Sequence, residues 1–524
     1  MIREGFQCIK VEYHLSIGLP TYKSHRFTLP FSVTRFTLAF HPRAAVLMAC
    51  APPPRPSHFL HRPSLHFASP PPPLHFPSLS SSPSTLAAFP RFRPPRRTPH
   101  SAAAVTAVTA PQSPEAAAAA VADDSGSVLK QDDRSVPLKK VLVPIAYGTD
   151  EMEAIILLGI LRRAGANVTL VSVEPQLEVE TSGRMRIVAD ALVGSCIREV
   201  YDLVALPGGM PGSARLRDCE VLQKITSKQA EEKRLYGAIC AAPAITLLPW
   251  GLMKKKQHTG HPAFKDDLPR FWAVKSDVQV SGELTTSRGP GTSFKFALSL
   301  VEQLFDESAS KAIRDSMFAS DSDDCSKQKE VNMVDWSINH SPRVLVPVAN
   351  GTEEMQVAVI VDILRRAKVD IVIASVEKSL RIVASQGCKV VADCLIGKAS
   401  DTTYDMIILP GDGIVLERLN KSRILKNLLK EHESSDRLFG AIFSSAAPAQ
   451  EVSGEKKATP LSSVINKFRE KFVEGVGIVI DGKIITGCGL ATSPDFALAI
   501  VTKLFGLPRA RCIAEALVYE YPKK

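Results

Sequence analysis

The chain has 524 residues, a formal net charge of +10 and ten cysteines. At roughly 150 residues per domain, this length predicts about three folding units. All of the net positive charge lies in residues 1–114, which contain 12 Lys and Arg but only two acids, while the remaining residues carry equal numbers of both signs. This distribution does not support a basic nucleic-acid-binding domain.

Membrane spans and structural metal sites are not expected. The sequence contains no run of about 18 apolar residues that could cross a bilayer. Its cysteines show neither a CxxC pair nor the Cys/His spacing of a zinc site. We therefore interpret them as free thiols of an intracellular protein.

Residues 1–114 have the composition of an organelle transit peptide. They are rich in Pro, Ser, Ala and Arg, and no acid occurs between Glu12 and Glu115. The proline run 70–73 and the prolines before it forbid the long amphipathic helix of a mitochondrial presequence. We therefore predict import into the chloroplast stroma, and the alternative is a disordered Pro-rich arm. Met48 resembles a natural start, which suggests that residues 1–47 lie outside the translated protein.

The rest of the chain is a duplication. Residues 140–174 return as residues 343–377 at a constant offset of 203, and YDLVALPGG and YGAIC return at the same offset as YDMIILPGD and FGAIF. A period of this length indicates two copies of a domain rather than a solenoid. We expect a linker over 115–137, a first copy over 138–318, a second linker over 319–341 and a second copy over 342–524.

Strands and helices alternate along the first copy. Short apolar segments predict strands over 140–145, 167–173, 202–206 and 237–239, and the apolar spacing of 151–164 predicts a helix that ends at Gly165. This order predicts an α/β domain whose parallel sheet has helices on both faces. Three features follow strand ends, where such sheets place their sites: the turn 148–153, the pair Gly208-Gly209, and Cys240.

Three reactive side chains stand out in the first copy. Cys240 follows a strand and precedes a helix, where free N–H groups favour a thiolate, although Cys is also a common small core residue. Glu153 lies in the first turn of a helix, where an acid could simply stabilise the helix dipole. His261, in the segment QHTGHP, could equally be a surface residue. Together a thiol, a carboxyl group and an imidazole can serve as nucleophile, acid and base.

These motifs resemble the ThiJ/PfpI superfamily, in particular its parkinsonism-associated DJ-one branch. The resemblance is carried by GTDEME, LRRAG, LPGG, AICAAP, the HP after a Lys run, and TSRGPGTSFKFAL over 286–298. It implies two tandem flavodoxin-like (class I glutamine amidotransferase-like) domains. It also implies Cys240 as an oxidation-sensitive nucleophile, Glu153 as the carboxyl group bonded to its sulfur and His261 as the nearby imidazole. Gly208 and Gly209 would supply backbone N–H groups, and Arg288 would line the substrate site.

The resemblance further implies a cofactor-free glyoxalase acting on methylglyoxal or glyoxal, a deglycase, or a redox-responsive chaperone-like activity. In the glyoxalase reaction the Cys240 thiolate would add to the aldehyde, Glu153 or His261 would move protons, and water would release a 2-hydroxy acid. No metal or nucleotide is required. A peptidase is disfavoured because Ala241 stands where peptidase-like members place a His. Tandem copies behind a transit peptide resemble plant members linked to plastid development and to oxidative and carbonyl stress.

The second copy has lost every reactive side chain. Gln356 aligns with Glu153, Phe443 or Ser445 with Cys240, and Thr459 with His261. The Arg288 motif has become GCGLATS, and LPGG has become LPGD. We expect this copy to pair with the first within the chain, as a retained packing partner. Two functions remain open: an enzyme centred on Cys240, or a non-catalytic scaffold or chaperone-like protein needed for chloroplast integrity.

Overall fold

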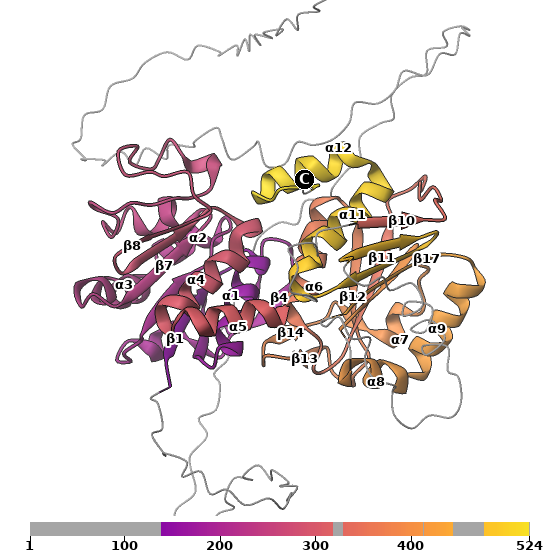
Figure 1. The fold of residues 1–524 in the computed structure, drawn as a ribbon. Coiled ribbons are helices and arrows are strands. Elements are labelled where there is room, and N and C mark those ends of the chain that lie inside the picture. The colour runs from indigo at the N-terminus through magenta and orange to yellow at the C-terminus, as the bar shows by residue number, and fades with distance from the viewer. Residues whose placement is uncertain (1–137, 318–327, 412, 444–475, 523–524) are drawn as a thin grey trace, which may run out of the picture. The chain divides into compact units, whose positions relative to one another are not determined.

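The computed structural model describes residues 138–317, 328–411, 413–443 and 476–522 (Figure 1). The transit peptide and linker predicted before residue 138 lie outside this range. So do Ser445 and Thr459, two of the substituted positions of the second copy. None of the described helices is long and apolar enough to cross a membrane.

The first copy is a sheet with helices on both faces, as the sequence predicts. Its strand order is β5-β2-β1-β6-β7-β9-β8, with parallel pairing everywhere except between β8 and β9. The sheet is therefore mostly parallel, with one antiparallel edge. Its strands are β1 (Lys140–Ile145), β2 (Asn167–Ser172), β5 (Ala191–Leu192), β6 (Leu203–Leu206), β7 (Leu235–Ile239), β8 (Val278–Ser281) and β9 (Leu284–Ser287).

The residues of β1 show how the sheet divides two cores. Val141, Val143 and Ile145 face one hydrophobic cluster and Leu142 faces another, because successive side chains of a strand point to opposite faces. The first cluster contains residues of α1 (Glu151–Arg163) and α4 (Ser293–Leu304), and the second contains residues of α2 (Gly212–Arg217) and α3 (Glu220–Glu231). A further helix, α5 (Glu307–Met317), packs on α4.

The second copy repeats this plan. Its strand order is β10-β18-β19-β17-β16-β11-β12-β15, with one antiparallel pair, β18–β19. The strands are β10 (Gln328–Val331), β11 (Arg343–Val348), β12 (Asp370–Ser375), β15 (Cys394–Leu395), β16 (Met406–Pro410), β17 (Leu438–Phe443), β18 (Ile478–Asp481) and β19 (Ile484–Cys488). The helices are α6 (Glu354–Arg366), α7 (Ile396–Ala399), α8 (Ile414–Lys421), α9 (Arg423–Ser434), α11 (Ser493–Phe505) and α12 (Leu507–Leu517).

The segment 319–341, expected as a linker, contributes to the second copy from residue 328 onwards. Strand β10 pairs in parallel with β18, and Trp336 is buried in the core with its indole N–H donating to the carbonyl of Gly482 at 2.8 Å. The polar composition of this segment concealed both features, because an edge strand needs no continuous apolar run.

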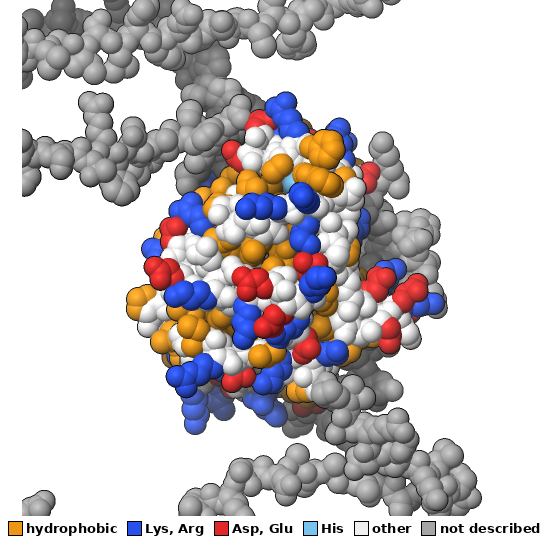
Figure 2. Space-filling model, turned by 90° about the vertical axis from the view of Figure 1, so that its left-hand side faces the viewer, with side chains coloured by type: hydrophobic (Ala, Val, Ile, Leu, Met, Phe, Trp, Pro, Cys, Tyr) orange, Lys and Arg blue, Asp and Glu red, His pale blue; other side chains and the backbone are white. Residues whose placement is uncertain are grey.

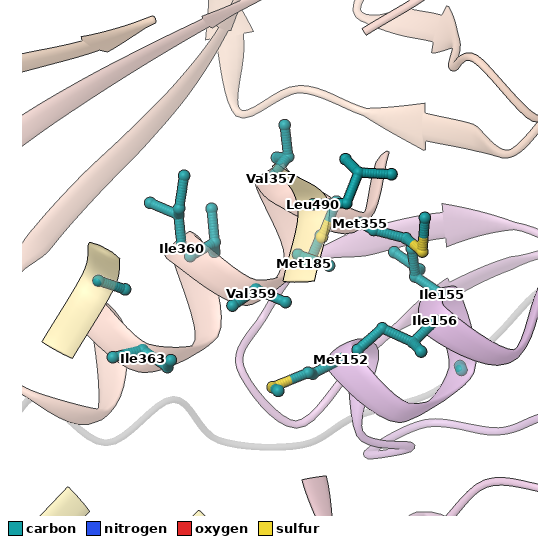
Figure 3. Close-up of a cluster of buried hydrophobic side chains, with 14 of the residues drawn as sticks. Met152, Ile155, Ile156, Met185, Met355, Val357, Val359, Ile360, Ile363 and Leu490 are labelled. Carbon is teal, nitrogen blue, oxygen red and sulfur yellow. The ribbon is translucent and has the colours of Figure 1, made fainter. Parts of the chain in front are cut away.

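One hydrophobic cluster contains residues of both copies. Helices α1 and α6 pack against each other, and Figure 3 shows Met152, Ile155 and Ile156 of α1 in the same cluster as Met355, Val359 and Ile363 of α6. A side chain at Gly159 would come within 3.0 Å of the Met355 sulfur, so the glycine permits the close approach.

A small antiparallel sheet also joins the copies. Its order is β13-β14-β4-β3, and β14 (Lys389–Val391) of the second copy pairs with β4 (Arg186–Val188) of the first. The outer strands are β3 (Glu178–Glu180) and β13 (Arg381–Val383). The two copies thus share both a core and backbone hydrogen bonds.

On the face shown in Figure 2, Lys and Arg side chains are interspersed with Asp and Glu.

We predict that Met355→Ala destabilises both copies together. Deleting a fully buried side chain of this size costs about 2–5 kcal/mol, and Met355 lies in the cluster that contains residues of α1 and α6. Denaturant unfolding followed by circular dichroism and by tryptophan fluorescence, which reports on both copies through Trp250, Trp272 and Trp336, should show one transition at lower denaturant. The control is Phe271→Ala, at a side chain that is 88% exposed, which should change the stability by less than about 0.5 kcal/mol. Two separate transitions in the unmodified chain would contradict the shared core.

Candidate active site

The site lies at the carboxyl ends of β1, β6 and β7, where the sequence places it. Cys240 directly follows β7 and adopts φ = 63°, a left-handed conformation that is uncommon for residues other than glycine. Its N–H donates to the carbonyl of Ser287 at 3.0 Å and its own carbonyl accepts from the His261 N–H at 3.0 Å. These backbone contacts hold the strained residue in place.

Glu153 and Cys240 lie on either side of Gly208. Its Oε2 accepts the Gly208 N–H at 2.6 Å. A Cβ atom at Gly208 would be 2.7 Å from the Cys240 Cβ and 2.8 Å from Glu153 Oε2, so only glycine fits between thiol and carboxyl group. Glu153 is fully buried, and its other oxygen, Oε1, has no hydrogen-bond partner within the described structure.

The thiol and the carboxyl group influence each other's ionisation. Burial raises the pKa of Glu153 well above its usual range, and the charge of Asp150 acts in the same direction. Burial also raises the pKa of the Cys240 thiol, as do the charges of Glu153 and Asp150, while the Gly209 N–H opposes the change. Such a pair carries at most one negative charge at neutral pH.

This result differs from the thiolate expected at a helix start. The helical segment after Cys240 is only Pro243–Leu247, and the two buried acids beside the sulfur outweigh the free N–H groups. Because Oε2 already accepts a hydrogen bond, the proton of a neutral Glu153 belongs on Oε1. Because that oxygen has no hydrogen-bond partner in the described structure, it is free to donate a hydrogen bond to a ligand bound beside Cys240.

His261 is placed beside the site by its backbone, but both of its ring nitrogens are engaged. Nδ1 accepts the Ala263 N–H at 3.2 Å, and Nε2 lies 3.1 Å from the carbonyl of Ala516. Since a carbonyl can only accept, the proton of the neutral ring is on Nε2. Burial lowers the pKa of His261, which favours this neutral form.

Two predicted site residues remain, Gly209 and Arg288. Gly209 adopts φ = +88°, and a Cβ atom there would come within 2.4 Å of the Asp150 nitrogen. Arg288 is partly exposed, and its guanidinium lies 3.8 Å from Asp277; its charge contributes to the lowered pKa of His261. Among the described residues no group of His, Cys, Asp and Glu side chains is arranged to hold a metal ion.

Sequence reasoning missed the two acids that precede Glu153. Asp150 caps α1 by accepting the Glu153 N–H at 3.1 Å. Glu151 accepts the Gly183 N–H at 2.9 Å and is fully buried. Burial raises the pKa of Asp150 to about 6 and that of Glu151 to about 7, and the charge of Asp362 adds to both. The signal was the acid-rich string TDEME itself, because it begins a helix whose next residues, 154–161, are apolar on every side and so offer no solvent-facing surface to the acids.

Comparison with known proteins identifies the class. The model of the DJ-1/PfpI family matches residues 139–303 and again residues 342–503. The chain therefore belongs to the DJ-1/PfpI family, with two copies of its domain.

Particular relatives are similar over different parts of the chain. Protein DJ-1 homolog B of Arabidopsis thaliana is 40% identical over 383 residues, which are 72% of this chain and 87% of the relative. Glutathione-independent glyoxalase DJR-1.2 of Caenorhabditis elegans is 34% identical over 159 residues, 30% of this chain and 82% of the relative. The solved structure of oxidized Toxoplasma gondii DJ-1 has 38% identity and a TM-score of 0.33, covering 33% of this chain and 95% of that one.

We predict that Glu151→Gln stabilises the protein at neutral pH. The pKa of Glu151 is about 7 in the folded protein and 4.5 in its ordinary state. A raised acid pKa contributes stability below about pH 4.5 that is lost as the pH rises towards 7. The variant should match the unmodified chain near pH 4.5 and exceed its free energy of unfolding by about 1–3 kcal/mol near pH 7.5.

Denaturant unfolding across this pH range provides the measurement. The control is Glu220→Gln, which replaces a solvent-exposed acid of α3 and should leave the pH dependence unchanged. A Glu151→Gln protein that is less stable than the unmodified chain near pH 7.5 would show that Glu151 is ionised and stabilising there.

Proposed function

We propose that the first copy is a cofactor-independent glyoxalase that converts a 2-oxoaldehyde of the methylglyoxal class into a 2-hydroxy acid. The observation that carries the proposal is the placement of Cys240 and the buried Glu153 on either side of Gly208, with a hydrogen bond between the two side chains contributing to both of their pKa shifts. The name of the Caenorhabditis elegans relative supports the same reaction class.

The side chains present are sufficient for each proton transfer. When the pair carries one negative charge, the Cys240 sulfur adds to the aldehyde carbon and the thiol proton passes to the carbonyl oxygen. This step gives a hemithioacetal and leaves Glu153 as a carboxylate. A carboxylate at Glu153 then removes the hydrogen of that carbon and returns it to the adjacent carbon, through an enediol, to leave a thioester. Water hydrolyses the thioester, which releases the 2-hydroxy acid and restores the thiol.

The geometry favours Glu153 over His261 as the proton carrier. Both ring nitrogens of His261 are engaged with Ala263 and Ala516. Glu153 has a buried, unpartnered oxygen and a pKa raised by burial. A raised carboxyl pKa lies nearer the working pH, where general acid–base catalysis is most effective.

The second candidate function is a scaffold or chaperone-like role without turnover. The buried thiol, whose pKa is raised, and the loss of the Glu153 counterpart at Gln356 favour it. Under this proposal Cys240 serves packing or redox sensing, and the chain supports plastid integrity or stress protection through its folded surface.

Lactate formation from methylglyoxal by the full chain separates the two functions. We predict that Cys240→Ser reduces turnover to the uncatalysed background and that Glu153→Gln reduces it by about 100-fold or more. The control is Cys219→Ser, at another partly buried free thiol of the first copy, which should retain activity. Equal rates for the unmodified chain and Cys240→Ser would reject the enzyme and favour the scaffold.

We also propose that residues 1–114 direct the protein to the chloroplast stroma. The proposal rests on their acid-poor, Pro- and Ser-rich composition. When these residues are fused to a fluorescent protein, isolated chloroplasts should import the fusion protein and shorten it by cleavage. If Met48 is the true start, a fusion that carries only residues 48–114 should be imported as well. Exclusion from chloroplasts, or uptake by mitochondria instead, would contradict the assignment.

A further inference from the structure

The contacts between the copies converge on the site of the first copy. Arg366 at the end of α6 donates to Asp150 Oδ2 at 2.8 Å. The other oxygen of Asp150 caps α1 by accepting the Glu153 N–H. A guanidinium of the second copy is therefore one side chain away from the carboxyl group beside Cys240.

Arg366 is itself held by an acid of its own helix. Its Nε donates to both oxygens of Asp362, at 2.9 and 2.8 Å. Asp150 and Asp362 are 3% and 1% exposed, so two buried acids share one partly buried guanidinium. Removing one partner of such a network leaves an uncompensated charge in the interior, which is strongly unfavourable.

The equivalent ion network at the start of α6, in the second copy, is incomplete. Arg163, the counterpart of Arg366, contacts Glu353, the counterpart of Asp150. Gly159 stands where the second copy has Asp362, and the Arg163 Nη1 is buried without a hydrogen-bond partner in the described structure. The Glu353 side chain makes no capping bond to α6.

The C-terminal segment of the second copy also reaches the site of the first copy. The Ala516 carbonyl lies at the His261 imidazole, and the residues after it pass over two glycines of the first copy. A Cβ atom at Gly291 would be 2.8 Å from both the Tyr519 Cβ and the Val518 carbonyl oxygen. The counterpart of Gly291 in GCGLATS is Ala491, which would not permit such an approach.

We infer that the second copy is a positioning half of the first copy's site: Arg366, fixed by Asp362, holds the Asp150 cap beneath Glu153, and the Ala516 carbonyl holds the His261 ring. Among the described residues, the second copy thus supplies a cation and a carbonyl acceptor to the surroundings of Cys240 and Glu153. This inference deepens the proposed function and rests on Cys240 and Glu153 as its reactive pair. It assigns Arg366 and Asp362 a role on the thiol environment beyond packing.

The reactivity of Cys240 tests the inference without requiring turnover. In the full chain, iodoacetamide labelling of Cys240 is followed against pH by site-resolved mass spectrometry. The variants are Arg366→Gln and, as the control, Arg163→Gln at the equivalent residue of the first copy. The charged groups that act on the pair are Asp150 and Arg366, and Asp362 in turn acts on Asp150 and Glu151. Removing the positive charge of Arg366 should move the labelling midpoint to higher pH by about one unit, and Arg163→Gln should leave it unchanged.

A second variant guards against misfolding. Asp362→Asn removes a negative charge from the same network and should move the midpoint to lower pH, opposite to Arg366→Gln. Equal midpoints for Arg366→Gln and Arg163→Gln, or shifts of Arg366→Gln and Asp362→Asn in the same direction, would show a packing role only and overturn the inference. Absence of lactate formation with the predicted labelling shifts would reject the glyoxalase and leave the positioning role standing.

Discussion

The packing of α1 against α6 is the constraint on which the rest of the structure depends. The two helices contribute apolar residues to one core, and the start of α1 places Asp150, Glu151 and Glu153 in the interior instead of in solvent. An isolated first copy would expose that apolar face. Burial of the acids has a direct chemical consequence, because low polarity raises the pKa of each carboxyl group and couples it to the neighbouring thiol. Packing and reactivity are therefore determined by the same helix pair.

Much of this arrangement could be predicted from the sequence because it depends on local patterns. The strand over 140–145 agrees in full with β1, the helix begins at Glu151 as expected, and the sheet has helices on both faces. The convergence of Glu153, Gly208-Gly209 and Cys240 followed from topology, since each comes after a parallel strand.

The remainder depends on contacts that no local pattern reveals. The ring of His261 meets a backbone carbonyl 255 residues away, and a carbonyl group is the same in every residue type. Strand β10 and the buried Trp336 lie in a polar stretch, and their places are fixed by β18 and by the carbonyl of Gly482. The thiol environment was misjudged for a similar reason: the helix start was visible in the sequence, but the depth at which Glu153 and Asp150 lie was not. The family resemblance supplied Glu153 as the partner of Cys240, which spacing alone left open.

Joining the copies in one chain changes how many sites a single substitution alters. In a symmetric homodimer every residue of the contact serves two identical sites, so a change that suits one role is imposed on the other. Here α1 and α6 are encoded separately, and a glycine at 159 coexists with an aspartate at 362 at equivalent positions. The tether also fixes the local concentration of the second copy, so that dilution does not separate the pair. In such a chain the two copies can specialise: selection can act on the reactive side chains of the first copy and, independently, on the residues of the second copy that surround them.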